Sequence, residues 1–200
     1  IEAPLYLSRL SEYYWMERLE HALYIQINEF IDNDDTSLKS FADRIQTVLA
    51  ASKLQNVILD LRHSAGGNGY LTPAVLRTLI AFDAAAESNA LFVIIGRNTF
   101  SASQNFITDL QRIATPIFVG EPSGSRPNAV SESGTFTLPF SGLSGMLSSQ
   151  LHQHSWPEDH RHWIAPDLPV GLSSVDFFAG HDPALAVIDA QIRERNDAAR

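Results

Sequence analysis

The sequence predicts an α/β domain built around a mostly parallel β-sheet. Short apolar runs typical of buried strands alternate with longer segments whose apolar residues recur at helical spacing. Three strand–helix units of this kind follow one another before residue 114. Parallel strands need crossover connections, so the alternation favours a sheet covered by helices and buried on both faces.

The strands are expected in four continuous apolar runs, at residues 22–30, 56–61, 91–95 and 116–119. The helices are expected in segments with one apolar face, at residues 37–51, from about 71 to 80, and from 101 to about 113. Pro73 agrees with these limits, because proline is tolerated only in the first turn of a helix.

After residue 120 the alternation stops. Residues 134–139 and 143–151 favour two strands of a C-terminal β-hairpin, and residues 157–169 form a loop that contains proline and histidine. A last helix is expected to begin with Asp182 as its cap and Pro183 at its first position.

Composition narrows the functional classes. A chain of 200 residues with 44% hydrophobic content suits one globular domain over residues 1–200, with an aromatic N-terminal arm at residues 1–20. The net charge of −9 argues against nucleic-acid partners. Without cysteine, disulfides, thiolate catalysis and zinc–thiolate sites are excluded.

Two further features concern the extent of the chain and its surroundings. No apolar run approaches the roughly 20 residues that a membrane-spanning helix needs, so no membrane span is expected. The chain begins with Ile1 rather than Met, which is compatible with a fragment of a longer chain or a processed form.

A serine-rich turn lies between a predicted buried strand and a predicted helix. Ser101 stands at the start of that helix, where the helix dipole and free backbone N–H groups favour developing negative charge. An acyl-transfer nucleophile needs this environment. The alternative is that Ser101 only caps the helix, since serine is a preferred N-cap residue.

Two other turns are expected close to this one. The turns over residues 62–69, 96–101 and 120–128 each follow a predicted parallel strand, so they are expected at the same edge of the sheet. Glycine has no Cβ to block a ligand, and the N–H groups of Gly66 and Gly67 are therefore candidates for an oxyanion hole.

These motifs resemble one family of enzymes. The resemblance rests on three segments in a fixed order with short gaps, Asp60-Leu61-Arg62 before Gly66-Gly67, then Phe100-Ser101-Ala102-Ser103, then Val119-Gly120-Glu121-Pro122. They are similar to the tail-specific, or C-terminal processing, serine peptidases. The resemblance covers roughly residues 23–128, and Ile164-Ala165-Pro166-Asp167 and Asp182-Pro183-Ala184-Leu185 extend it.

The resemblance implies a ClpP/crotonase-like core and a serine endopeptidase that works through an acyl-enzyme. It implies Ser101 as the nucleophile, with Ser103 as a neighbouring alternative that points elsewhere on the helix. It implies an oxyanion hole at Gly66 and Gly67, a peptide or protein substrate, and no metal or other cofactor. Relatives are often exported, which favours export slightly over the cytoplasm. The oligomeric state is left open.

The chain departs from the family at the general base. The bacterial enzymes carry a lysine shortly after the Gly-Glu-Pro turn, and the matching position here is Arg126. Arginine stays protonated and cannot act as a base. Lys39 and Lys53 lie in or just after the first predicted helix. The sequence therefore resembles a divergent member of this family that lacks the usual lysine base.

Three arrangements remain open. A histidine upstream of the core could be the base, as in the tricorn-like branch, with Glu158 or Asp159 as its orienting acid. His63, shortly before the two glycines, could instead reach Ser101. Alternatively, the domain has lost catalysis and binds a ligand or peptide, with Arg126 holding a carboxylate. A crotonase-type acyl-thioester enzyme is a further rival by fold analogy.

Four histidines stand near one another as two His-x-His pairs. Such spacing on a strand can bind zinc, but no motif such as His-Glu-x-x-His accompanies it, and an exposed histidine-rich loop is favoured. The four are His152, His154, His160 and His162.

Overall fold

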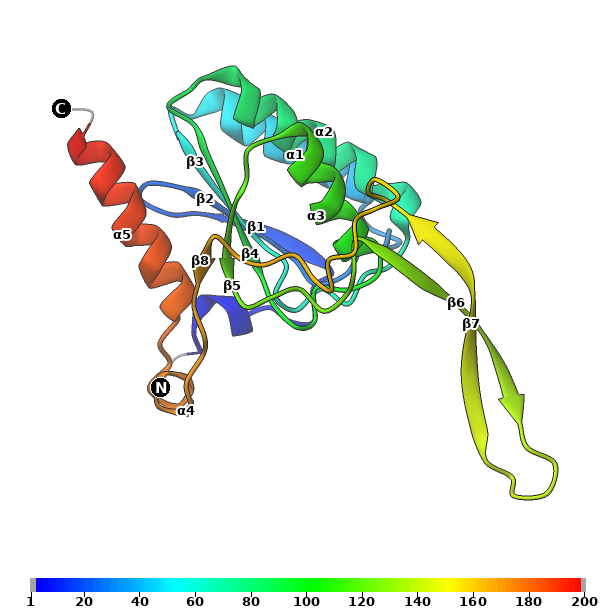
Figure 1. Ribbon diagram of the computed structural model, residues 1–200. Coiled ribbons are helices and arrows are strands. Elements are labelled where there is room, and N and C mark those ends of the chain that lie inside the picture. The colour runs from blue at the N-terminus through cyan, green and yellow to red at the C-terminus, as the bar shows by residue number, and fades with distance from the viewer. Residues whose placement is uncertain (1–2, 199–200) are drawn as a thin grey trace.

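A computed structural model of the chain describes residues 3–198 and confirms the α/β fold (Figure 1). Its six-stranded sheet has the order β1-β2-β3-β4-β5-β8, with β1 antiparallel to β2 and every later pair parallel. The strands of the sheet are β1 (Tyr14–Arg18), β2 (Leu23–Ile27), β3 (Asn56–Asp60), β4 (Ala90–Ile95), β5 (Ile117–Gly120) and β8 (Leu168–Pro169).

Helices cover both faces of the sheet, as Figure 1 shows, with α1, α2 and α3 on one face and α5 on the other. The long helices are α1 (Leu38–Ala51), α2 (Thr72–Ala85), α3 (Ala102–Ile113) and α5 (Pro183–Ala198), and the short ones are η1 (Leu5–Leu7), η2 (Gly69–Leu71) and α4 (Ser174–Ala179). A separate antiparallel hairpin, β6 (Asn128–Thr137) and β7 (Ser144–Gln153), projects from the domain.

The three central strands are buried along their whole length, as their apolar runs predicted. Alternate side chains point to opposite faces. Leu59 and Val93 pack in the cluster beneath α1, α2 and α3, whereas Phe92 packs in the cluster beneath α5. The parallel sheet therefore has two hydrophobic cores, and its carboxyl edge is where the connecting turns emerge.

Local capping signals explain where the helices begin. Ser37 accepts a hydrogen bond from the Ser40 N–H and the two form a capping box at the start of α1. Asp182 accepts from the N–H groups of Ala184 and Leu185, as expected of a cap for α5.

The structure contains elements that apolar patterning did not predict. Residues 14–18, within the predicted N-terminal arm, form β1 at the sheet edge, and residues 1–2 of that arm lie outside the described residues, as do 199–200. The strands β6 and β7 extend further towards the domain than expected, because the mostly polar residues 128–133 lack a strand-like apolar alternation. The division into one domain and an arm stays a prediction. Within residues 3–198, none of the helices combines the length and apolar character of a membrane span.

A buried ion cluster ties the end of β3 to the start of α5. The Arg62 guanidinium donates both to Asp182, at 3.0 and 2.9 Å, and to Asp60, at 3.1 Å. It also lies 4.3 Å from the centre of the Tyr6 ring, which joins η1 to the cluster. Removing one partner leaves the others buried with uncompensated charge.

We predict that Arg62→Leu lowers the free energy of unfolding by about 3–5 kcal/mol, because Asp60 and Asp182 then stay buried without a countercharge. Denaturant titration measures this loss. Arg97→Leu is the matched control, since Arg97 pairs with Glu121 at the surface and its side chain is 83% exposed. The control should lose less than about 1 kcal/mol, and equal losses would contradict the role of burial.

Candidate active site

Three turns meet at the carboxyl edge of the sheet, as their positions after parallel strands predicted. The hydroxyl of Thr99 donates to the Leu61 carbonyl at 2.9 Å, and the Phe100 N–H donates to the Ser64 carbonyl at 3.2 Å. The Gly124 N–H donates to the Thr99 carbonyl at 2.9 Å. The serine turn is therefore held between the double-glycine turn and the turn after β5.

Ser101 has a strained backbone conformation. Its φ of 53° and ψ of −123° make it one of two non-glycine residues with positive φ within residues 3–198. A non-glycine residue in this region of φ and ψ costs about 1–3 kcal/mol and persists only where its surroundings enforce it. Tertiary contacts therefore hold Ser101 in place.

The Ser101 side chain does not cap α3. Although Ser101 occupies the N-cap position, its hydroxyl accepts no hydrogen bond from the helix, and the residue is exposed. The capping alternative is therefore wrong for the side chain. No hydrogen bond within residues 3–198 occupies the hydroxyl, which leaves it available to a ligand.

Gly66 and Gly67 explain what holds the backbone of the serine turn in its strained conformation. Both have positive φ, at 119° and 122°. A Cβ on Gly66 would lie 2.7 Å from the Ser101 Cβ, and one on Gly67 would lie 2.5 Å from the Phe30 carbonyl oxygen. Phe30 pairs with Gly67 in an isolated parallel bridge that extends beyond β2. Only glycine fits either position.

Backbone N–H groups without a hydrogen-bond acceptor lie in the turns beside Ser101. Ala102, the first residue of α3, follows Ser101 directly, and its nitrogen lies 3.0 Å from the Cβ that Gly66 lacks. Among the hydrogen bonds of residues 3–198, none uses the N–H of Gly66, Gly67 or Ala102 as donor. Such free donors at a helix N-terminus suit an oxyanion. The assignment of an oxyanion hole to Gly66 and Gly67 stays a prediction.

Ser103, the neighbouring serine, is fully buried. Its hydroxyl lies 2.6 Å from that of Ser64. The pair joins the double-glycine turn to α3 from inside, so Ser103 points away from the exposed side of the turn, as expected.

His63 lies on a neighbouring part of the same edge. Its ring stacks on Tyr6 with a centroid distance of 5.8 Å, and its buried Nε2 has no hydrogen-bond partner. Burial lowers the pKa of His63 below its ordinary value, so the ring is neutral at neutral pH. No hydrogen bond joins it to Ser101 among the described residues, and its role as base stays a prediction.

His63 also lines a cavity of about 470 Å³ at the ends of β4 and β5. Arg97 and Asn98 of the serine turn and Glu121 of the following turn form part of its wall. The cavity therefore lies next to the serine turn and shares residues with it.

The two predicted orienting acids do not contact a histidine within residues 3–198. Asp159 is buried, and Arg161 donates to its carboxylate from both Nε and Nη2, at 2.9 and 2.7 Å. These hydrogen bonds hold the pKa of Asp159 well below its usual range. Glu158 is exposed beside it. The structure gives Asp159 a loop-stabilising contact, and the orienting role of either acid stays a prediction.

Arg126 has a partner that the sequence did not reveal. Its Nη2 donates to Nδ1 of His162 at 2.7 Å, so the neutral His162 ring carries its proton on Nε2. In that tautomer Nε2 has no lone pair with which it could accept the proton of a nucleophilic hydroxyl. No sequence pattern links the two residues, which meet because Ser123 pairs with Ile164 through two hydrogen bonds.

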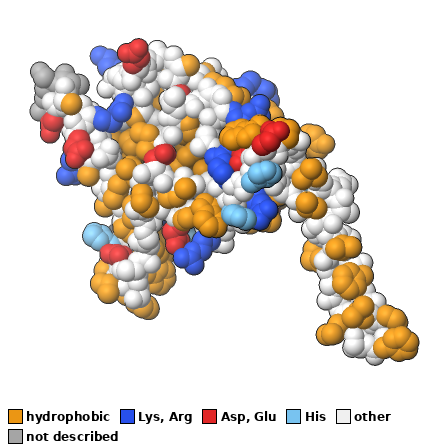
Figure 2. Space-filling view, in the orientation of Figure 1, with side chains coloured by type: hydrophobic (Ala, Val, Ile, Leu, Met, Phe, Trp, Pro, Cys, Tyr) orange, Lys and Arg blue, Asp and Glu red, His pale blue; other side chains and the backbone are white. Residues whose placement is uncertain are grey.

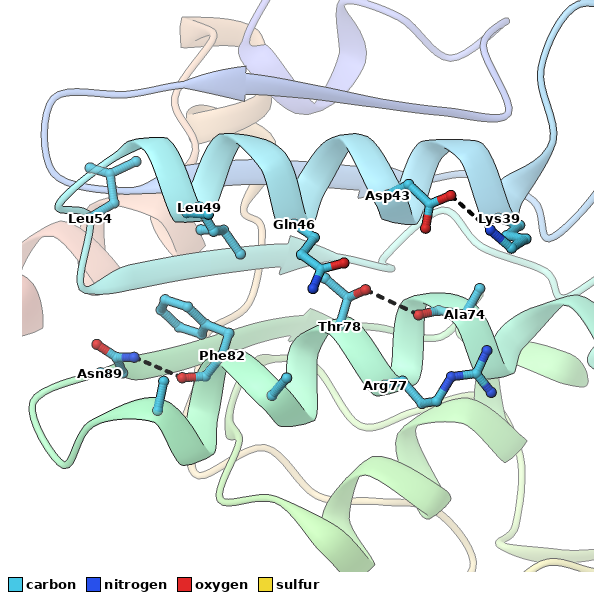
Figure 3. A pocket seen from close by; sticks show the side chains of 13 residues that line it. Lys39, Asp43, Gln46, Leu49, Leu54, Ala74, Arg77, Thr78, Phe82 and Asn89 are labelled. Carbon is cyan, nitrogen blue, oxygen red and sulfur yellow. Dashed lines mark hydrogen bonds and ion pairs between the residues drawn. The ribbon is translucent and has the colours of Figure 1, made fainter.

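A cavity larger than the one beside His63 lies away from these turns. It is a groove of about 560 Å³ between α1 and α2, lined by Leu49, Phe82 and the Lys39–Asp43 ion pair, as Figure 3 shows. None of its lining residues comes from the three turns, and we place the candidate active site at the strand ends instead. Within residues 3–198, no three histidine or carboxylate side chains gather as a metal site would need.

Comparison with solved structures relates the fold to peptidases. CPAF in complex with lactacystin matches with a TM-score of 0.60 and 10% identity over 86% of this chain and 51% of its own. A candidate peptidase from Parabacteroides merdae matches with a TM-score of 0.59 and 15% identity over 88% of this chain and 63% of its own. The photosystem II D1 C-terminal processing protease matches with a TM-score of 0.51 and 16% identity over 75% and 42%.

These similarities concern the fold of the chain. The chain has the α/β fold found in serine peptidase domains, and it spans 63% or less of the length of these three peptidase structures. No protein-family model and no curated protein matches the sequence. The finer assignment to a ClpP/crotonase-like core stays a prediction.

We predict that Gly66→Ala destabilises the protein by at least about 2 kcal/mol, because alanine at this φ is strained and its Cβ would overlap Ser101. Thermal or denaturant unfolding measures the change. Gly69→Ala is the control, since a Cβ there meets nothing within 4 Å. It should change stability by less than about 0.5 kcal/mol, and a similar loss in both variants would contradict this account.

We predict that stability falls as the pH drops below about 6.5, in part because of His63. The unfolded chain binds a proton on this ring at higher pH than the folded protein does, so acid favours unfolding. His63→Phe should reduce the pH dependence of the melting temperature between about pH 7.5 and 5.5, while His160→Phe, at an exposed site, should not. An unchanged slope in His63→Phe would contradict the prediction.

Proposed function

We propose that this chain is the core of a serine endopeptidase that cleaves peptide bonds through an acyl-enzyme on Ser101. The observation that carries the proposal is the strained backbone of Ser101, whose hydroxyl is exposed and free at the N-terminus of α3. A helix cap does not require this strain. Strained residues held by over-determined surroundings cluster at active sites.

The reaction follows from the groups around the hydroxyl. The Ser101 Oγ attacks the scissile carbonyl carbon while a general base takes its proton. The N–H groups of Gly66 and Gly67, together with that of Ala102, then stabilise the oxyanion of the tetrahedral intermediate. The base returns the proton to the departing amine, and water hydrolyses the acyl-enzyme. The peptidase fold of the matching structures supports a peptide or protein substrate.

We assign the general base to His63. Its pKa is lowered, so the ring is neutral and able to accept a proton at neutral pH, and its Nε2 has no competing partner. The ring must leave its stack on Tyr6 and turn towards Ser101 when substrate binds. Catalytic hydrogen bonds often form only in the substrate complex, so the present position is compatible with this role.

One observation favours a second candidate function. Within residues 3–198 no side chain hydrogen-bonds to the Ser101 hydroxyl, and Arg126 occupies the position where the resembled family carries its lysine base. The alternative is therefore a non-catalytic domain that binds a peptide or ligand at the same edge, with Arg126 contacting a carboxylate.

We predict that a fluorophosphonate probe labels the protein at Ser101 and that Ser101→Ala abolishes the labelling, because the probe reacts only with activated serines. Peptide mapping by mass spectrometry locates the adduct. Ser125→Ala, in the neighbouring turn, is the control and should keep full labelling. Absence of labelling in a folded protein would favour the binding domain.

The base is tested separately. His63→Gln should reduce the labelling rate by at least about 100-fold and remove its dependence on pH near the pKa of the histidine. Labelling that survives in His63→Gln would contradict this base and show that another group takes the proton. That outcome would leave Ser101 as the nucleophile.

A further inference from the structure

The β6–β7 hairpin projects from the domain as a two-stranded ribbon with no third layer on its outer part (Figure 1). Each strand has ten residues, so each extends about 34 Å. A two-stranded hairpin alone is at best marginally stable in water. Some further packing is therefore needed to hold it rigid.

One face of the ribbon carries the large apolar side chains Val130, Phe136, Leu147 and Leu151, with Glu132 and Ser149 at the strand positions between them. Directly paired residues share a face, and the pairs Val130 with Leu151 and Gly134 with Leu147 lie on the same side as Phe136. The Leu147 side chain is 71% exposed. The opposite face carries mostly serine and threonine, from pairs such as Ser133 with Ser148. Figure 2 shows hydrophobic side chains along the length of the ribbon.

The tip extends this surface. Leu138, Phe140 and Leu143 are exposed in the loop that joins the strands, and Phe140 is fully exposed. We call the apolar face and the tip together the hairpin surface, made of Val130, Phe136, Leu138, Phe140, Leu143, Leu147 and Leu151.

The ribbon also lacks charge. Glu132 is the only acidic or basic residue, histidine aside, between residues 128 and 153. Exposed strands usually carry charged side chains that prevent pairing with other chains. Their absence removes both the protection against association and the ionic groups that would select a partner of opposite charge.

We infer that the hairpin surface is a dimer interface and that a second copy of this chain covers it, face to face, about a two-fold axis. A two-fold interface needs one self-complementary patch, and an apolar ribbon face stacked on its copy at about 10 Å forms a small β-sandwich. The seven side chains expose on the order of 100 Å² each, or roughly 700 Å² per copy. Stable interfaces bury about 800 Å² per partner.

The first test measures the mass of the purified protein by sedimentation equilibrium over micromolar concentrations. The wild type should approach twice the chain mass of 22.1 kDa. The double variant F140S/L147S should weaken the dimer by at least about 100-fold, because each side chain loses its apolar contact. Met146→Ser is the matched control, since Met146 is 70% exposed but lies on the opposite face, and it should leave the dimer within about threefold.

The second test does not depend on weakening the interface. The chain has no cysteine, so a single introduced thiol reports its own surroundings. Ser149→Cys, on the apolar face, should be joined to its copy by a short bis-maleimide, whereas Ser148→Cys, on the opposite face, should not.

A wild type that stays monomeric would overturn the inference and indicate that a different occupant covers the hairpin surface. Equal cross-linking at both positions, or an unweakened dimer in a folded F140S/L147S protein, would also overturn it. These results are independent of Ser101 labelling, so the dimer and the peptidase proposal can fail separately.

Discussion

The contact between Gly66 and Ser101 is the constraint on which the candidate site depends. The backbone of the double-glycine turn approaches the serine turn so closely that a methyl group on Gly66 would overlap the Ser101 Cβ. Gly67 is pressed against Phe30 on its other side. The close approach of the double-glycine turn therefore holds the Ser101 backbone in place, which explains how it tolerates a positive φ. In this conformation the hydroxyl is exposed and does not cap the helix.

The polar groups of this region are of two kinds, paired charged groups and unpaired neutral groups. Carboxylates that the fold buries, Asp60, Asp159 and Asp182, are each paired with an arginine, so they stabilise loops and helix ends. Within residues 3–198, the groups near this contact that have no hydrogen-bond partner are uncharged, and they include the Ser101 hydroxyl, the nearby N–H groups, the Tyr6 hydroxyl and Nε2 of His63. An oxyanion gains most where unpaired donors are preorganised and no fixed negative charge competes with it. This division of charge supports acyl transfer at Ser101.

The hairpin differs from the candidate site in which of its groups have no partner. Its backbone is paired internally, but its apolar side chains remain in water. It begins directly after the turn that carries Arg126, and Gly124 of that turn donates a hydrogen bond to Thr99 of the serine turn. The proposed dimer interface and the candidate active site are thus close in the chain, although their tests are independent.

The sequence by itself determined the alternation of strands and helices, the helix cap at Asp182, and the gathering of three turns at one edge. These depend on local apolar spacing and on the direction of parallel strands, both of which are written in short segments. The aromatic edge strand β1 lacks that signal, and so do the ends of β6 and β7 that lie nearest the domain. Only the tertiary structure decided the strained backbone of Ser101, the stacking of His63 on Tyr6 and the pairing of Arg126 with His162. Each of these arises from a contact between residues far apart in the chain, and no spacing within one segment encodes such a contact.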